Sequence, residues 1–326
     1  MSEQDPRVLL QKADKALQSA SGGFSFFGGK TEKFENAADL YTQAANAFRV
    51  QKMSSSPPRF RDTLLLGGSR IRNEASSELT ACWNDIDKEA GAAFEKAAAI
   101  FTLNLNEPGD AANTLTEAFK VYRKSDPEDA ARVLQTAIQH YITTGNFRRA
   151  ASHQQNLAEV YEVEIGDETR ALAAYEKAAE WFEGDNAEAL ANKHFLKVAD
   201  LAALKADYLK AVTNFEKVAK SSINNNLMKW SVKEYFMKAT MCHLASKDLV
   251  ATNRALQSYC ELDNSFQATR EFALLTDLAQ AVEQGDTDAF GDRLYEYDQL
   301  SKLDKWKTAI FLRIKNNIEE TGEDFS

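Results

Sequence analysis

Residues 90–101 read AGAAFEKAAAIF, and phrases of the same kind follow as AANTLTEAFKVY at 111–122, AARVLQTAIQHY at 130–141 and AASHQQNLAEVY at 150–161. Further copies begin at residues 37, 171, 191 and 211. From residue 90 onward the copies start 19 to 21 residues apart, which is the length of one helix and one short turn. Two copies make a helical hairpin of about forty residues, close to the tetratricopeptide class.

The residue types inside the phrase explain how its helices would pack. Small Ala residues at the start let neighbouring helices approach, and the large residues four to eight positions later fill the space between them. Turn signals separate the copies: Ser125-Asp126-Pro127 is typical of a helix start, and Gly145 and Gly184 are typical of helix ends. The sequence therefore predicts an all-α, tetratricopeptide-like helical-hairpin solenoid.

The spacing of the phrase also predicts the domain organisation. The repeat array covers 1–220, a C-terminal helical bundle covers 221–318, where longer and irregular helical patterns follow, and a frayed acidic tail covers 319–326. The copies at 37 and 90 are 53 residues apart, so the segment 53–87 is surplus. Its Pro pair, Gly pair and many serines predict an inserted flexible loop. Intervening sequence translated in the gene model would give the same composition break.

Composition narrows the function classes. The net charge of -10 and pI near 5.1 disfavour the broad basic surface that nucleic acids require. Cys82, Cys242 and Cys260 lie far apart, without the spacing of a disulfide framework or a zinc site, as expected in a reducing cytosol. We see no signal-peptide pattern and no run of about eighteen apolar residues. The expected location is cytoplasmic.

The sequence contains no complete motif of a catalytic or nucleotide-binding site. The stretch Gly22–Thr31 ends like a nucleotide-binding loop, but five residues separate Gly23 from Gly29 where such a loop needs four. The four histidines lie in separate helical phrases without paired-ligand spacing, and no GxSxG occurs. The sequence predicts a protein that holds other proteins, with no catalytic residues, no cofactor and no metal.

Several longer phrases carry a more specific resemblance. FENAADLYTQAANAF, KVYRKSDPEDAARVLQTAIQHY, TTGNFRRAASHQQNLAEVYE, ALANKHFLKVADLAAL, KWSVKEYFMKATMCHLA and LYEYDQLSKLDKWKTAIFLRIK occur in this order. Together they resemble the soluble NSF attachment proteins of the alpha-SNAP family, and the fungal members in particular. The resemblance runs from Phe34 to Phe48 and from Lys88 to the end, and the family lacks the surplus segment. A gamma-type relative, or another repeat scaffold with different trafficking clients, is the alternative.

The resemblance implies a mechanism and a set of contacts. Several copies would wrap a four-helix SNARE bundle, and an NSF-type AAA ATPase would dock on their C-terminal ends and pull the bundle apart during vesicle fusion and ER–Golgi protein transport. A basic strip would meet the acidic SNARE bundle, and an N-terminal Phe loop would contact the membrane peripherally. The implied SNARE-binding residues are Arg123, Lys124, Arg148, Arg149, Lys193, Leu227, Trp230, Lys233 and Arg270. The implied membrane-contacting residues are Phe24, Phe26 and Phe27, and the implied NSF-binding residues are Glu283, Asp286, Asp324 and Phe325. For Trp230, a place in the core is the alternative.

Overall fold

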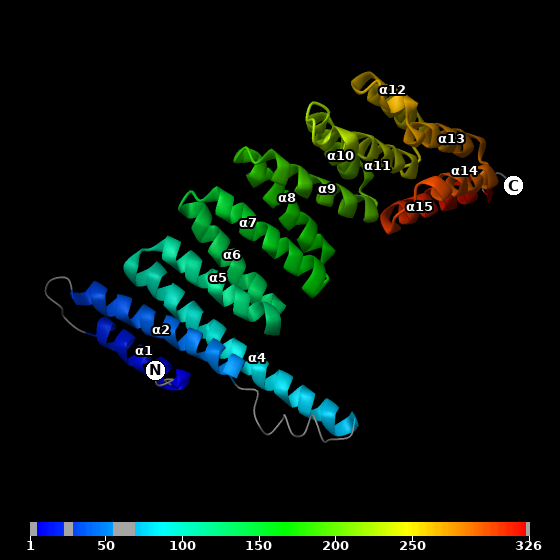
Figure 1. Ribbon diagram of the computed structural model, residues 1–326. Coiled ribbons are helices and arrows are strands. Elements are labelled where there is room, and N and C mark those ends of the chain that lie inside the picture. Colours follow the sequence, from blue (N-terminus) through cyan, green and yellow to red (C-terminus); the bar gives the residue numbers. More distant parts are fainter. Residues whose placement is uncertain (1–4, 23–28, 55–68, 324–326) are drawn as a thin grey trace. The chain divides into compact units, whose positions relative to one another are not determined.

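The computed structural model describes residues 5–22, 29–54 and 69–323, and fourteen α-helices account for most of that part of the chain (Figure 1). Successive helices form antiparallel hairpins that stack side by side, as the sequence predicts. The chain divides into two compact units, Met1–Trp181 and Phe182–Ser326. The predicted boundary between residues 220 and 221 falls inside the second unit, within helix α10.

The first unit contains the regular hairpins. Its elements are α1 (Pro6–Ser21), α2 (Gly29–Ser54), α4 (Ser69–Ile100), the π-helical turn η1 (Phe101–Leu105), α5 (Pro108–Ser125), α6 (Pro127–Thr143), α7 (Phe147–Glu159), the π-helical turn η2 (Val160–Ile165) and most of α8 (Glu168–Gly184).

The second unit begins at the end of α8 and includes the C-terminal helices. Its elements are α9 (Glu188–Leu204), α10 (Tyr208–Ser222), the 3-10 turn η3 (Lys229–Ser231), α11 (Val232–Ala245), α12 (Leu249–Leu262), the 3-10 turn η4 (Phe266–Ala268), α13 (Arg270–Gln284), α14 (Thr287–Leu300) and α15 (Lys305–Glu323).

The repeated Ala phrase forms the core of both units. The first Ala of every copy is buried, and so are large residues of the same phrases, among them Phe94, Leu134, Phe182 and Phe215. As the sequence predicts, small Ala residues let the helices approach closely and large residues fill the space between them. Turn signals are also confirmed: Asp126 caps α6 by accepting a hydrogen bond from Asp129 N, Gly145 has φ +74°, and α8 ends at Gly184.

One contact between helices leaves no room for a side chain. A Cβ placed on Gly91 of α4 would overlap the ring of Tyr122 on α5. The Tyr122 hydroxyl donates a hydrogen bond of 2.8 Å to Glu95 Oε1 on α4, and Arg132 of α6 donates to both oxygens of the same carboxylate at 2.7 and 2.9 Å. Glu95 therefore links three successive helices.

The structure differs from the loop that the sequence predicts over 53–87. Residues 53 and 54 end α2, and residues 69–87 form the first part of α4. The two prolines and the Gly pair of this segment all precede Ser69, so the residues after it contain nothing that breaks a helix. Residues 55–68 lie outside the described part of the chain.

The predicted acidic tail also differs in part. Helix α15 continues to Glu323, so residues 319–323 are helical. An amphipathic helix that starts at Lys305 extends into the acidic segment because Glu is a good helix former.

Candidate partner-binding surface

The basic residues expected on the strip lie on every second helix. In the first unit, Arg123 and Lys124 end α5, and Arg148 and Arg149 begin α7. In the second unit, the three basic residues lie on alternate helices, Lys193 on α9, Lys233 on α11 and Arg270 on α13. Alternate helices of stacked hairpins form one layer, so within each unit these residues belong to a single layer of helices (Figure 1).

Polar contacts show how the two pairs of the first unit lie relative to each other. Arg149 Nη1 donates a hydrogen bond of 3.3 Å to Asn113 Oδ1, near the start of α5. Arg123 Nε donates one of 2.5 Å to Glu164 Oε1, beyond the end of α7. Helices α5 and α7 therefore run in the same direction. Arg123 and Lys124 lie at the C-terminal ends of these parallel helices, and Arg148 and Arg149 lie at their N-terminal ends.

Arg149 is part of an aromatic stack. Its guanidinium lies 5.8 Å from the ring centre of Tyr141, and the His153 ring stacks on Tyr141 at 5.2 Å and 7°. Burial lowers the pKa of His153, and the nearby Arg149 and Lys120 lower it further. The neighbourhood of His153 is therefore electropositive even though the chain as a whole is acidic.

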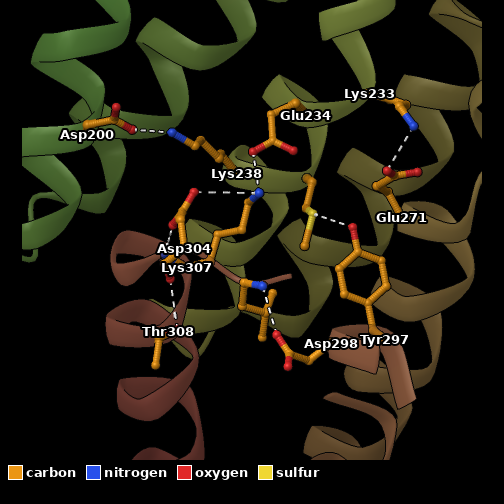
Figure 2. Close-up of polar contacts among 12 residues, drawn as sticks. Asp200, Lys233, Glu234, Lys238, Glu271, Tyr297, Asp298, Asp304, Lys307 and Thr308 are labelled. Carbon is orange, nitrogen blue, oxygen red and sulfur yellow. Dashed lines mark hydrogen bonds and ion pairs between the residues drawn. The ribbon is translucent and has the colours of Figure 1, made fainter. Parts of the chain in front are cut away.

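In the second unit, two of the three basic residues are close together. Lys233 Nζ forms an ion pair of 2.9 Å with Glu271, the neighbour of Arg270, so the starts of α11 and α13 lie side by side (Figure 2). Arg270 and Lys193 are exposed. Because Glu271 Oε1 already pairs with Lys233, Lys233 carries a structural contact as well as surface charge.

The position of these residues within their helices has an electrostatic consequence. Arg148, Arg149, Lys233 and Arg270 all lie in the first turn of a helix. The helix dipole is positive there, so a cation costs stability, by about 0.3–1 kcal/mol at an exposed site. The dipole and the side-chain charges add, and the combination attracts anionic groups. The contacts of Lys233 with Glu271 and of Arg149 with Asn113 and Tyr141 offset part of this cost.

Leu227 and Trp230 lie in the connection between α10 and α11. They are 91% and 76% exposed, so the alternative that Trp230 belongs to the core is wrong. The Leu227 amide donates a hydrogen bond of 3.0 Å to Asn225 Oδ1, and Lys229 Nζ lies 5.5 Å from the ring centre of Trp230. The connection thus presents two large apolar side chains beside a cation that the sequence analysis missed.

Two of the acidic residues expected to face the ATPase lie where α13 ends and α14 begins: Glu283 is in the last turn of α13, and Asp286 is the N-cap of α14. Glu283 and Asp286 are exposed. Asp286 Oδ1 also accepts from the amides of Asp288 and Ala289 at 3.1 and 2.8 Å, which caps α14, so Asp286 has a structural role. Phe24, Phe26, Phe27, Asp324 and Phe325 lie outside the described residues.

Helix α15, which leads to the C-terminus, is fastened by contacts that the sequence analysis missed. Trp306 Nε1 donates a hydrogen bond of 3.0 Å to the Asp200 carbonyl on α9, and Lys238 Nζ of α11 pairs with the Asp200 carboxylate at 2.7 Å. Lys307 Nζ pairs with Glu234 at 2.6 Å (Figure 2). Burial raises the pKa of Asp200 despite the neighbouring Lys238.

Arg313 adds a second attachment of α15. Its guanidinium donates to the carbonyls of Ala203 and Leu204, at 2.9 and 2.6 Å, and so caps the end of α9. Trp306 is 106 positions from Asp200 and Arg313 is 110 from Ala203, and a separation of this size leaves no periodic signal in a sequence.

Other classes of site receive no support from the geometry. Over the described ranges, no set of three or more His, Cys, Asp or Glu side chains is grouped as metal ligands would be. His153 and His194 instead stack on aromatic rings, of Tyr141 and Phe182. No helix within the described parts is both long enough and apolar enough to cross a bilayer.

The protein consists of stacked helical hairpins with basic residues on alternate helices and exposed apolar side chains. These features are typical of helical-repeat proteins that bind other macromolecules. The model of the soluble NSF attachment protein family (SNAP) matches residues 4–58 and 83–319. The chain belongs to this family. Residues 59–82, inside the surplus segment, are outside the match.

Relatives agree over nearly the whole chain. It is similar to a "Probable vesicular-fusion protein sec17 homolog" of Neurospora crassa, 49% identical with 99% of each chain covered. The protein of the same name from Schizosaccharomyces pombe is 45% identical, again over 99% of both chains. The "Alpha-soluble NSF attachment protein" of Homo sapiens is 34% identical, over 99% of this chain and 97% of the relative.

Proposed function

We propose that this chain is an adaptor that binds SNARE complexes, and that it recruits and stimulates an NSF-type ATPase for their disassembly in vesicle fusion and intracellular protein transport. Membership of the attachment-protein family supports this, and no catalytic step by the chain itself is part of it. The protein would work in the cytoplasm, peripherally on membranes.

The observation that carries the proposal is the exposure of Leu227 and Trp230 within a basic setting. Aromatic residues with most of their surface in water are enriched at binding hot spots, where a partner covers them. Lys229 lies over Trp230, and Lys233 follows at the start of α11. An acidic helical bundle that also presents apolar side chains, as a SNARE bundle does, complements both features.

The remaining expected contacts lie in the N-terminal Phe loop, at the junction of α13 and α14, and in the C-terminal tail. Phe24, Phe26 and Phe27 would enter the bilayer interface, where exposed Phe side chains find an apolar environment. Phe325 and the acidic residues around Glu283, Asp286 and Asp324 would engage the ATPase, because acidic side chains steer this end toward a basic surface. These roles rest on the resemblance to the family.

The test is ATP-dependent disassembly of a soluble SNARE complex by NSF in the presence of this protein. We expect that replacing Leu227 and Trp230 together with Ser slows disassembly at least tenfold and lowers affinity for the SNARE complex, because hot-spot truncations cost about 2 kcal/mol or more. Leu209→Ser is the matched control, because Leu209 is 81% exposed in the same unit and is not expected to contact SNAREs.

A further double variant tests the charge. Reversal of Arg148 and Arg149 to Glu should weaken SNARE binding most at low salt, because screening removes the attraction at high salt. Normal disassembly by the Leu227/Trp230 variant would contradict the proposal. Absence of any NSF-dependent disassembly by the wild-type protein would favour the alternative of a repeat scaffold with other trafficking clients.

A further inference from the structure

A cavity of about 320 Å³ opens in the first unit, where α2, α4 and α5 meet. Four cationic side chains line it, Arg49 and Lys52 from α2 and Lys120 and Lys124 from α5. The remaining lining comes from Trp83 and Asp87 of α4 and from Val121. Of this group, only Lys124 is among the contact residues that the sequence predicts.

The charges around the cavity do not balance. Asp87 pairs with Lys52, and Glu117 pairs with Arg49 at 3.1 Å and with Lys120 at 2.5 Å. Three of the four cations therefore share two carboxylates. Lys124 is exposed and forms no ion pair with the side chains that the structure describes. The cavity keeps an excess of positive charge.

The spacing of these cations is itself unfavourable for an empty site. Arg49 and Lys52 are three residues apart on α2, and Lys120 and Lys124 are four apart on α5. Like charges at these spacings face each other on a helix and cost about 0.2–0.5 kcal/mol per pair. Two such pairs on adjacent helices, facing one cavity, are relieved by an anion that several of them contact together.

The shape of the cavity selects among anions. Its volume is at the lower end of small-molecule sites and is larger than one phosphate group fills. The half-buried indole of Trp83 and the buried Val121 give one side an apolar surface, on which the carbon face of a ring can lie. We propose that this cavity binds a ring that carries several phosphates, of the inositol phosphate type. The source is either the headgroup of a phosphorylated inositol lipid or the free inositol phosphate.

This site is distinct from the proposed SNARE and NSF contacts, with Lys124 as the one shared residue. Binding can therefore be measured on the full chain alone. Titration calorimetry with inositol trisphosphate should show saturable binding at one site per chain. Inorganic phosphate at the same concentration should bind at least tenfold more weakly, because it spans fewer of the cations.

Variants separate a built site from diffuse charge. Lys120→Gln with Lys124→Gln should weaken inositol trisphosphate binding roughly tenfold, through loss of charge-assisted hydrogen bonds. Lys12→Gln with Lys15→Gln makes the same change in net charge on the exposed surface of α1, and should leave binding within about twofold, because distant charges are screened. Equal weakening in both double variants would overturn the proposal.

A gain of affinity provides the sharpest outcome. Glu117→Gln removes the carboxylate that competes for Arg49 and Lys120, so it should tighten inositol trisphosphate binding about threefold. If these ion pairs served only to hold the helices together, Glu117→Gln would weaken or abolish inositol trisphosphate binding. Unchanged or weaker binding by a folded Glu117→Gln protein would count against the site.

Vesicles then identify the source of the ligand. Phosphatidylcholine vesicles with phosphatidylinositol bisphosphate should bind the wild-type protein more tightly than vesicles that carry the same charge as phosphatidylserine, if the lipid headgroup is the ligand. The Lys120/Lys124 double variant should lose this preference. Binding of inositol trisphosphate without any vesicle preference would assign the site to the free molecule. Equal binding of both vesicle types with no binding of inositol trisphosphate would refute it.

Discussion

The two units hold their helices together with different chemistry. In the first unit, carboxylates link neighbouring helices through cations whose side chains are about half exposed: Asp14 accepts from Tyr41 and Lys96, Glu95 from Tyr122 and Arg132, and Glu128 from Arg170. In the second, the cation is more buried: Lys238, only 15% exposed, contacts both Asp200 and Trp306 and joins helices far apart in sequence. The first unit repeats one kind of contact between neighbouring helices, whereas in the second unit contacts of α15 with α9 and α11 join distant parts of the chain.

The comparison predicts where the largest loss of stability lies. Trp306→Ala removes the hydrogen bond to Asp200 and the ring packing of α15, and should lower the free energy of unfolding of the second unit by about 3 kcal/mol. Amide hydrogen exchange should accelerate in α9, α11 and α15 and stay unchanged in α2 to α6. Trp230→Ala, at an exposed Trp of the same unit, should change stability by less than about 0.5 kcal/mol. Equal effects of the two substitutions would break the comparison.

Matched cations in the two units give the second test. Lys238→Ala removes a cation that is only 15% exposed and leaves Asp200, whose pKa burial raises, without its partner, so it should cost about 2 kcal/mol. Arg132→Ala leaves Glu95 with Tyr122 and access to water, so it should cost about 0.5–1 kcal/mol. Urea denaturation followed by tryptophan fluorescence measures both. A larger loss for Arg132→Ala would reverse the ranking of the units.

A single hydroxyl in the first unit should have a smaller effect. Tyr122→Phe deletes the hydrogen bond to Glu95 and keeps the ring against Gly91, so the expected loss is about 1 kcal/mol. Tyr295→Phe, at an exposed tyrosine, serves as the control and should be neutral within the error of thermal denaturation. A neutral Tyr122→Phe would mean that the Glu95 link contributes nothing to the first unit.

The smallest expected effect concerns pH: as pH falls, the contributions of Glu95 and Asp200 to the free energy of unfolding should change in opposite directions. Burial raises the pKa of Glu95, but hydrogen bonds from Arg132 and Tyr122 outweigh burial, so its pKa in the folded protein is below 4.5. Glu95 therefore stabilises the fold at neutral pH, and this contribution is lost as pH falls through the folded-state pKa. The pKa of Asp200 is raised by burial, so its contribution improves as pH falls toward 3.8. Between about pH 5 and pH 3, Glu95→Gln should lose less stability than the wild type and Asp200→Asn more, each by a few tenths of a kcal/mol. Urea denaturation at each pH measures the difference, and slopes of the same sign for both variants would contradict this assignment.

The sequence predicts the contacts that repeat and misses those that do not. The Ala phrase predicted the helices and their core, and Asp126 and Gly145 marked helix boundaries, because these signals are local and recur. The helix over 69–87 was missed, because the Gly and Pro residues before it suggested a loop over the whole of 53–87, whereas α4 already begins at Ser69.

The candidate site divides in the same way. Resemblance supplied the basic residues, and their location on alternate helices follows from the regular hairpins. The exposure of Trp230 required the structure, because an aromatic residue before an apolar helix reads equally well as core. Arg49, Lys52 and Trp83 could not be grouped with Lys120, because α2, α4 and α5 bring them together only in space. Like-charge spacing on α2 and on α5 was the signal available in the sequence.

Gly91 shows how narrowly one position of the array is specified. Every other residue type carries a Cβ, and at position 91 that atom would occupy the space of the Tyr122 ring. A substitution there would displace the ring from α4, withdraw its hydroxyl from Glu95 and shift α5, whose Lys120 and Lys124 line the cavity. Among the first two positions of the Ala phrase, this is the site where a library of variants should return the glycine codon alone.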